Sequence, residues 1–149
     1  MFRGINAVTL DAKGRLAIPT RYRDALAAAP TCIVTIDTEE SCLLLYPLDA
    51  WKPIEAKILQ LPSFNPASRR IQRLLIGHAT EVEFDTHGRF VLPPLLREYA
   101  ALEKQAVMIG QGHKFEIWGD KAWQAKRQDW LTEAARAEVL PDEMKDIAL

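Results

Sequence analysis

Apolar and polar residues alternate over two stretches of the chain that carry the same motif. Residues 11–19 read Asp-Ala-Lys-Gly-Arg-Leu-Ala-Ile-Pro, and residues 85–93, 74 positions later, keep Asp, Gly, Arg and Pro at the same spacing. In a strand, successive side chains point to opposite faces. Leu16 and Ile18 therefore share one face, and Arg15 lies on the other. The pattern predicts a tight turn followed by a short strand whose arginine faces solvent, and it does so twice.

The residue types of the motif explain the turn and the elements on either side of it. An aspartate can accept a hydrogen bond from the backbone two residues on, and a glycine supplies a positive φ. Residues 7–10 also alternate, so we expect them to pair with residues 15–18 as a hairpin. Pro19 suits the first turn of a helix in which Tyr22 and Leu26 form a buried stripe.

The rest of the first half predicts two buried strands and two helices. Residues 32–36 and 43–46 are apolar runs, and Asp49 can cap a helix that carries Trp51. A second helix, starting at Asn65 with a proline next to it, bridges the two halves. We expect all four tryptophans to be core or interface anchors rather than platforms on which bases stack.

The second half repeats these elements, with a loop that is two residues shorter. A unit of about 45 residues cannot easily close a core alone. We therefore expect an α+β fold dominated by a compact β-barrel, in which strands of both halves interleave and helices lie outside. The expected segments are a first repeat, a helical linker, a second repeat, and a C-terminal helix with an acidic tail, at residues 5–51, 52–78, 79–122 and 123–149.

Charge and composition limit the classes of function. The 149 residues carry a formal net charge of −1, so any nucleic-acid surface must be local. Residues 1–25 have a net charge of +3 and residues 133–149 a net charge of −3, which indicates a basic face and an acidic tail. The start lacks a signal-peptide pattern, and no apolar run approaches the roughly 20 residues of a membrane helix. We expect a cytosolic protein without membrane contact.

Candidate chemistry for an enzyme is missing from the sequence. The two cysteines have no metal-binding spacing and are expected to be buried fillers, and the three histidines are not spaced as metal ligands. No glycine-rich phosphate loop or GxSxG turn occurs. The sequence therefore predicts no enzymatic activity, cofactor, metal or small-molecule substrate.

Further motifs complete a resemblance to a known family. They are Met-Phe-Arg-Gly at residues 1–4, Leu-Leu-Tyr-Pro at residues 44–47, and the linker at residues 69–79 with Arg-Arg-x-Gln-Arg and Gly-His-Ala. Together with the Asp-x-Lys-Gly-Arg turn, they resemble the MraZ family, which are bacterial transcriptional regulators built of two SpoVT-AbrB-type domains.

The resemblance implies a swapped-hairpin or double-psi-like barrel that assembles into homo-oligomeric rings. It also implies sequence-specific binding to double-stranded DNA at short direct repeats in promoters. These repeats lie upstream of the division and cell-wall gene cluster, and binding usually represses transcription. The implied location is the cytoplasm and the nucleoid.

Six basic residues are the candidate DNA contacts. Arginine can donate two hydrogen bonds to guanine, while lysine mainly supplies charge to phosphates. Lys13 and Arg15 carry over from the family motif, and Arg89 carries over from the second turn, where His87 replaces the lysine. We expect the first turn to hold the DNA and the second to serve mainly the barrel. The candidate set is Lys13, Arg15, Arg21, Arg3, Arg23 and Arg89.

Several of these residues have alternative interpretations. Lysine and arginine are common on solvated turn tips, which is the alternative for Lys13 and Arg15, and Arg21 could form a salt bridge to Asp24 or to another subunit. Arg23 has a counterpart in Arg97, so a shared structural role is at least as plausible as DNA contact. Three linker arginines could form a second basic patch, but we expect them to pair with carboxylates across a subunit interface or to cap neighbouring chain ends, namely Arg69, Arg70 and Arg73. Two alternatives to a DNA-binding regulator stay open: an antitoxin-like module that binds a toxin, and a ring-forming scaffold without DNA.

Overall fold

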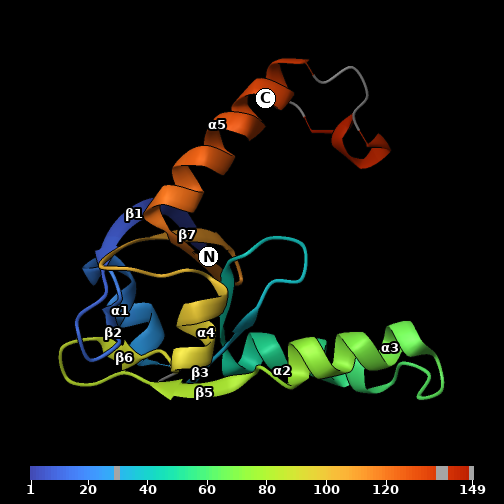
Figure 1. Cartoon of the computed structure of the whole chain (residues 1–149), viewed down its shortest axis with the longest axis horizontal. Helices are drawn as coiled ribbons and strands as arrows, with labels where there is room; N and C mark the ends of the chain where they lie inside the picture. Colours follow the sequence, from blue (N-terminus) through green and yellow to red (C-terminus); the bar gives the residue numbers. More distant parts are fainter. Residues whose placement is uncertain (29–30, 137–140, 148–149) are drawn as a thin grey trace.

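A six-stranded antiparallel sheet forms the centre of the computed structural model, which describes residues 1–28, 31–136 and 141–147 (Figure 1). In spatial order its strands are β1 (Phe2–Thr9), β7 (Gln105–Gly112), β8 (Phe115–Gly119), β4 (Leu43–Pro47), β3 (Thr31–Ile36) and β5 (Thr80–Glu83). A separate two-stranded ribbon pairs β2 (Arg15–Ala17) with β6 (Arg89–Val91).

The two halves of the chain exchange strands. β1 pairs with β7, β4 pairs with β8, β3 pairs with β5, and β2 pairs with β6, so each of these ladders joins the first half to the second. Interleaving of the two halves was predicted from the repeat and is confirmed. Neither half buries its own strands without the other.

Two expectations about the strands are wrong in this structure. Residues 7–10 do not form a hairpin ladder with residues 15–18: the direct links are one isolated bridge between Leu10 and Leu16 and a bond from the Asp11 N–H to the Arg15 carbonyl, while β2 pairs with β6 instead. The expected closed barrel does not form either, since β1 and β5 are the two edges of an open sheet in the described residues. The swapped-hairpin arrangement and the four segment boundaries stay predictions.

The helices surround the sheet and ribbon. α5 extends away from the sheet at one side, and α2 and α3 extend together at another (Figure 1). The helical segments are α1 (Thr20–Ala27), α2 (Leu48–Leu59), α3 (Pro66–Ile71), the π-helical η1 (Gln72–Ile76), α4 (Pro94–Tyr99), α5 (Asp120–Arg136) and the short 3-10 helix η2 (Asp142–Met144).

Prolines and one asparagine set the starts of these helices. Pro19, Pro47 and Pro93 occupy the N-cap positions of α1, α2 and α4, each with an extended ψ that turns the chain out of the preceding strand. The cap predicted at Asp49 is therefore wrong, because α2 begins one residue earlier and Asp49 lies in its first turn. The cap predicted at Asn65 is confirmed: its Oδ1 accepts from two backbone N–H groups of α3, at 2.9 and 3.4 Å.

The ribbon packs its inner face into the main core. Leu16 and Phe90 lie opposite each other in the register and are 0% and 1% exposed. The side chains of Val34, Leu45 and Phe115 from the large sheet belong to the same cluster. The ribbon therefore acts as a lid over one face of the sheet, held by apolar contact.

Tryptophans pack on the opposite face of the sheet, in agreement with the prediction that they anchor the core. Trp118 of β8 and Trp123 of α5 are buried in one cluster, and Trp130 of α5 packs against Trp118 with ring centroids 5.6 Å apart. Trp51 of α2 is buried against Tyr46. The acidic tail falls only partly among the described residues, since residues 137–140 and 148–149 are outside them.

Truncating the ribbon core should destabilise the protein more than truncating its outer face. Phe90→Ala should lower the free energy of unfolding by about 3–5 kcal/mol, because it removes a buried aromatic side chain and leaves a cavity. Val91→Ala, at the neighbouring residue that is 57% exposed, should change it by about 0.5 kcal/mol or less. Denaturant titration at one protein concentration measures both, and equal losses would contradict the packing described.

Both thiols should be unreactive in the folded protein. Burial raises the pKa of Cys32 to about 12, and burial together with the carboxylates of Glu116 and Asp37 raises the pKa of Cys42. A raised pKa lowers the thiolate fraction at pH 8, and the thiolate is the reactive form. Ellman's reagent should therefore label neither thiol in the native chain and both after denaturation. Rapid labelling of the native protein would show that one of these sites opens.

Candidate nucleic-acid interface

The two repeated motifs fold into matching turns. In the first, the carbonyl of Asp11 accepts from the Gly14 N–H at 3.0 Å, and Gly14 has a φ of +77°. In the second, the carbonyl of Asp85 accepts from the Gly88 N–H at 3.0 Å, and Gly88 has a φ of +70°. A side chain is strained at such angles, which explains the glycine in both copies.

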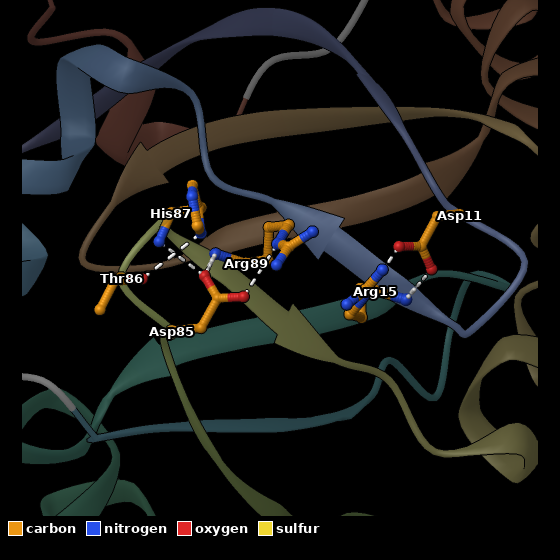
Figure 2. Close-up of polar contacts among 6 residues, drawn as sticks. All are labelled: Asp11, Arg15, Asp85, Thr86, His87 and Arg89. Atoms are coloured by element: carbon orange, nitrogen blue, oxygen red, sulfur yellow. Dashed lines mark hydrogen bonds and ion pairs between the residues drawn. The ribbon is translucent and has the colours of Figure 1, made fainter.

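The aspartate side chain organises each turn and holds its arginine (Figure 2). Asp11 Oδ1 accepts from the backbone N–H groups of Lys13 and Arg15, both at 2.9 Å, and Asp11 Oδ2 accepts from Arg15 Nε at 2.7 Å. Asp85 makes the same three bonds, with the Arg89 Nε at 2.8 Å. Each guanidinium is thereby fixed to its own turn.

These bonds lower the pKa of both carboxyl groups. The Arg89 backbone N–H is the main cause for Asp85, whose pKa falls to about 2, and the Arg15 backbone N–H is the main cause for Asp11. Because each pKa is lowered, each carboxylate stabilises the folded protein fully at pH values above the ordinary pKa of 3.8. This stabilisation is lost as the pH falls through the lowered pKa. Both turns therefore keep their charged form throughout the neutral range.

The two arginines share the outer face of the ribbon. Arg15 lies opposite Val91 and Arg89 lies opposite Ala17, so the arginines are diagonal neighbours across two strands. Diagonal positions in an antiparallel pair are about 7–8 Å apart. Their side chains are 30% and 34% exposed. Strand exchange thus brings together two residues that are 74 positions apart in sequence, as Figure 2 shows.

Each arginine keeps donors available for a ligand. Within the described residues, Nε bonds to the aspartate and the terminal Nη groups of Arg15 and Arg89 have no protein acceptor. A guanidinium held in this way can donate two parallel hydrogen bonds to the O6 and N7 acceptors of guanine. A two-stranded β-ribbon also fits the width of the major groove of B-DNA. The ribbon face therefore has both the shape and the donors for base contact.

The turn tips differ in charge. Lys13 is exposed at the tip of the first turn, and His87 is exposed at the matching position of the second. His87 Nδ1 lies 3.4 Å from Thr86 Oγ1. The first tip therefore carries a lysine where the second carries a histidine.

Arg3 and Arg21 lie together and apart from the first turn. Arg21 Nη2 donates to Asn6 Oδ1 at 2.6 Å and to the Arg3 carbonyl at 3.2 Å, and its guanidinium lies over the ring of Tyr22. Arg3 stands near the start of β1, eight residues before the first turn, which in a strand is about 25 Å. Both residues are exposed.

Arg23 is placed at the second turn, although it is closer in sequence to the first. A Cβ on Gly88 would lie 2.7 Å from Arg23 Nε, and Arg23 Nε donates to the Ile18 carbonyl at 3.2 Å. Its counterpart Arg97 packs in the same way against Gly14 of the first turn. Arg97 was not among the residues predicted for the site; the signal that could have found it is its position one repeat length after Arg23.

The linker arginines and a group of potential metal ligands lie elsewhere. Arg69, Arg70 and Arg73 are exposed on α3 and η1, with no carboxylate in salt-bridge range in the part of the chain that is described; partners in another subunit stay a prediction.

Oxygen atoms of Asp37 and Glu116 and the sulfur of Cys42 lie within 4.8 Å of one another. Burial and the two neighbouring carboxylates raise the pKa of this thiol.

Across residues 1–28, 31–136 and 141–147, no helix has the length and apolarity needed to cross a membrane.

Comparison with known proteins matches the chain over its length. The family model described as "MraZ protein, putative antitoxin-like" matches residues 1–74 and again residues 75–139. Proteins named "Transcriptional regulator MraZ" are similar to it: 61% identical in Legionella pneumophila, 54% in Coxiella burnetii and 51% in Halorhodospira halophila. Each of these matches spans 152 residues and covers 100% of both chains. The two matches of the family model correspond to the two repeats, and the chain belongs to the MraZ family.

Proposed function

We propose that this protein is a sequence-specific DNA-binding transcriptional regulator that reads promoter DNA with the outer face of its β2–β6 ribbon. The observation that carries the proposal is the pair formed by Arg15 and Arg89, fixed through Nε to Asp11 and Asp85 with their other donors facing out. The name of the relatives, transcriptional regulator, supports the same class of function and gives no support to an enzyme.

The ribbon would enter the major groove with its arginines toward the bases. Arg15 and Arg89 donate to guanine, and Lys13 at the turn tip contacts a phosphate. Because about 7–8 Å separates diagonal residues of a ribbon and base pairs stack about 3.4 Å apart, the two arginines reach bases roughly two steps apart. Arg23 lies beside the second turn, whereas Arg3 and Arg21 lie near the start of β1, and all three add positive potential around this surface.

Several protomers must act together to bind tightly. A chain with a net charge of −1 offers few phosphate contacts, and linking several weak sites raises the overall affinity steeply. We propose a homo-oligomeric ring whose protomers read successive direct repeats upstream of the division and cell-wall gene cluster, with repression as the usual outcome. Such a protein acts in the cytoplasm at the nucleoid.

A DNA-binding experiment can distinguish the proposed regulator from two other functions. An antitoxin-like module would bind a toxin protein with higher affinity than DNA, and a scaffold would form rings that do not bind DNA. A gel-shift experiment with the DNA upstream of the protein's own gene, and with a scrambled duplex of equal length, separates these from a regulator. Only a regulator shifts the native duplex in preference to the scrambled one.

Binding to the native duplex should weaken steeply with salt and change little between pH 7 and 9. Each phosphate contact adds roughly 0.9 to the slope of log affinity against log salt. Lysine and arginine stay charged in this pH range. Fluorescence anisotropy at several salt concentrations and pH values measures both. A sharp loss of affinity between pH 7 and 9 would show that a group other than these cations controls binding.

Removing the first arginine should weaken binding more than removing the second. Arg15→Ala should cost about 1–3 kcal/mol per engaged site, the usual scale for a bidentate base contact. Arg89→Ala should cost less, because the first turn carries Lys13 beside Arg15 whereas the second carries a histidine in the matching position.

The comparison needs one operator, one salt concentration and a charge control. Arg127→Ala removes an exposed arginine of α5, away from the ribbon, and should leave affinity close to the wild type. Size-exclusion chromatography must show the same assembly for all variants. Equal losses for Arg15→Ala and Arg89→Ala would mean that both turns read DNA alike, and a larger loss for Arg89→Ala would reverse the assignment.

A further inference from the structure

Each turn of the ribbon is braced by an arginine from the opposite repeat. A Cβ on Gly14 would lie 2.9 Å from Arg97 Cζ, and a Cβ on Gly88 would lie 2.7 Å from Arg23 Nε. Arg97 belongs to α4, which follows the second turn, and Arg23 belongs to α1, which follows the first. The two glycines therefore have a second role besides their positive φ, which is to let a guanidinium lie directly against the turn backbone.

Backbone hydrogen bonds join each turn to the residues just before the helix that carries its bracing arginine. The Ile18 N–H donates to the Gly88 carbonyl at 2.9 Å, and the Ile18 carbonyl accepts from Arg23 Nε. In the other copy, the Leu92 N–H donates to the Gly14 carbonyl at 2.9 Å. Ile18 thus holds both the second turn and its bracing arginine, Arg23, whereas Leu92 holds the first turn alone.

The two braces are not identical. Arg97 Nε is buried and has no hydrogen-bond partner among the described residues, whereas Arg23 Nε has one. A buried donor without an acceptor is unfavourable on its own. The brace at the first turn, where Lys13 and Arg15 lie, therefore carries an unsatisfied donor that the brace at the second turn does not.

We infer that Arg97 and Arg23 are positioning residues for DNA binding, each setting the turn of the opposite repeat without touching DNA itself. The inference rests on the proposed function of the ribbon. Arg97 supports the DNA contacts made by Arg15, and Arg23 supports those made by Arg89. Arg23 therefore has a role other than direct contact with DNA.

The physical reason is pre-organisation. Cavities of about 650 and 320 Å³ lie beside the two braces, the first lined by Asp11 and Arg97 and the second by Asp85 and Arg23. Shortening either arginine joins its volume to the neighbouring cavity and leaves the turn backbone uncovered. The aspartate that fixes the DNA-contacting guanidinium then loses its rigid support, and binding must order the turn again.

A double-mutant cycle tests the assignment. Arg97→Gln should weaken binding to the native duplex by roughly 3- to 30-fold, within the range of coupling between residues in contact. In an Arg15→Ala background the same change should have less than about a 2-fold effect, whereas in an Arg89→Ala background it should keep its full effect. Arg23→Gln should show the reverse pattern, and Arg127→Gln, the charge control, should show no effect in any background. Low salt keeps the weak variants measurable.

The salt dependence separates positioning from direct contact. A lysine or arginine that neutralises a phosphate changes the slope by about 0.9 when it is removed. Arg97→Gln and Arg23→Gln should leave the slope unchanged while lowering affinity. A slope that falls by about one contact, or a loss that is the same in both single-mutant backgrounds, would overturn the inference.

Hydrogen–deuterium exchange tests the brace without DNA. Arg97→Gln should raise deuterium uptake in peptides covering residues 9–16 and leave residues 84–90 unchanged, while Arg23→Gln should do the opposite. Unchanged uptake at both turns would overturn the inference. If neither Arg15→Ala nor Arg89→Ala alters affinity while the exchange pattern holds, the proposed function fails and the bracing of the turns stands.

Discussion

Pairing of β2 with β6 is the contact on which the rest of this molecule depends. Each strand is three residues long and could not persist alone, but together they place Leu16 against Phe90 over the core of the sheet. The same pairing fixes which side chains face outward, because alternate residues of a strand point to opposite faces. The pairing of β2 with β6 therefore both buries Leu16 and Phe90 and turns Arg15 and Arg89 outward.

Local chemistry made the turns predictable. An aspartate that accepts backbone bonds and a glycine at positive φ specify the same geometry in any context, and the structure has both at residues 11–14 and 85–88. The buried face of residues 15–18 followed from strand alternation. The partner of the strand did not, because the pattern of β2 is equally compatible with β1 and with β6. The choice depends on β6, which pairs with β2 although it lies 74 residues further along the sequence.

In the candidate site, too, the local features could be predicted from the sequence and the long-range contacts could not. Arg15 and Arg89 were found because each belongs to a local motif, but their convergence on one face is a property of the exchanged strands. Sequence proximity placed Arg23 with the first turn, whereas α1 carries it to the second. Arg97 was overlooked as a site residue for the matching reason: its target, Gly14, lies in the other repeat. Short-range reasoning locates groups within a repeat and cannot tell which repeat they serve.

Strand exchange also has an evolutionary consequence. A chain with only one repeat would have an unpaired β2 and a glycine turn without its arginine, so a second identical copy would be needed to complete both. Two such copies would be constrained to carry the same residue at each tip. Joining them in one polypeptide removes that constraint, and positions 13 and 87, now lysine and histidine, have already diverged. Fusion of the repeats therefore lets selection adjust the two halves of a single recognition surface independently.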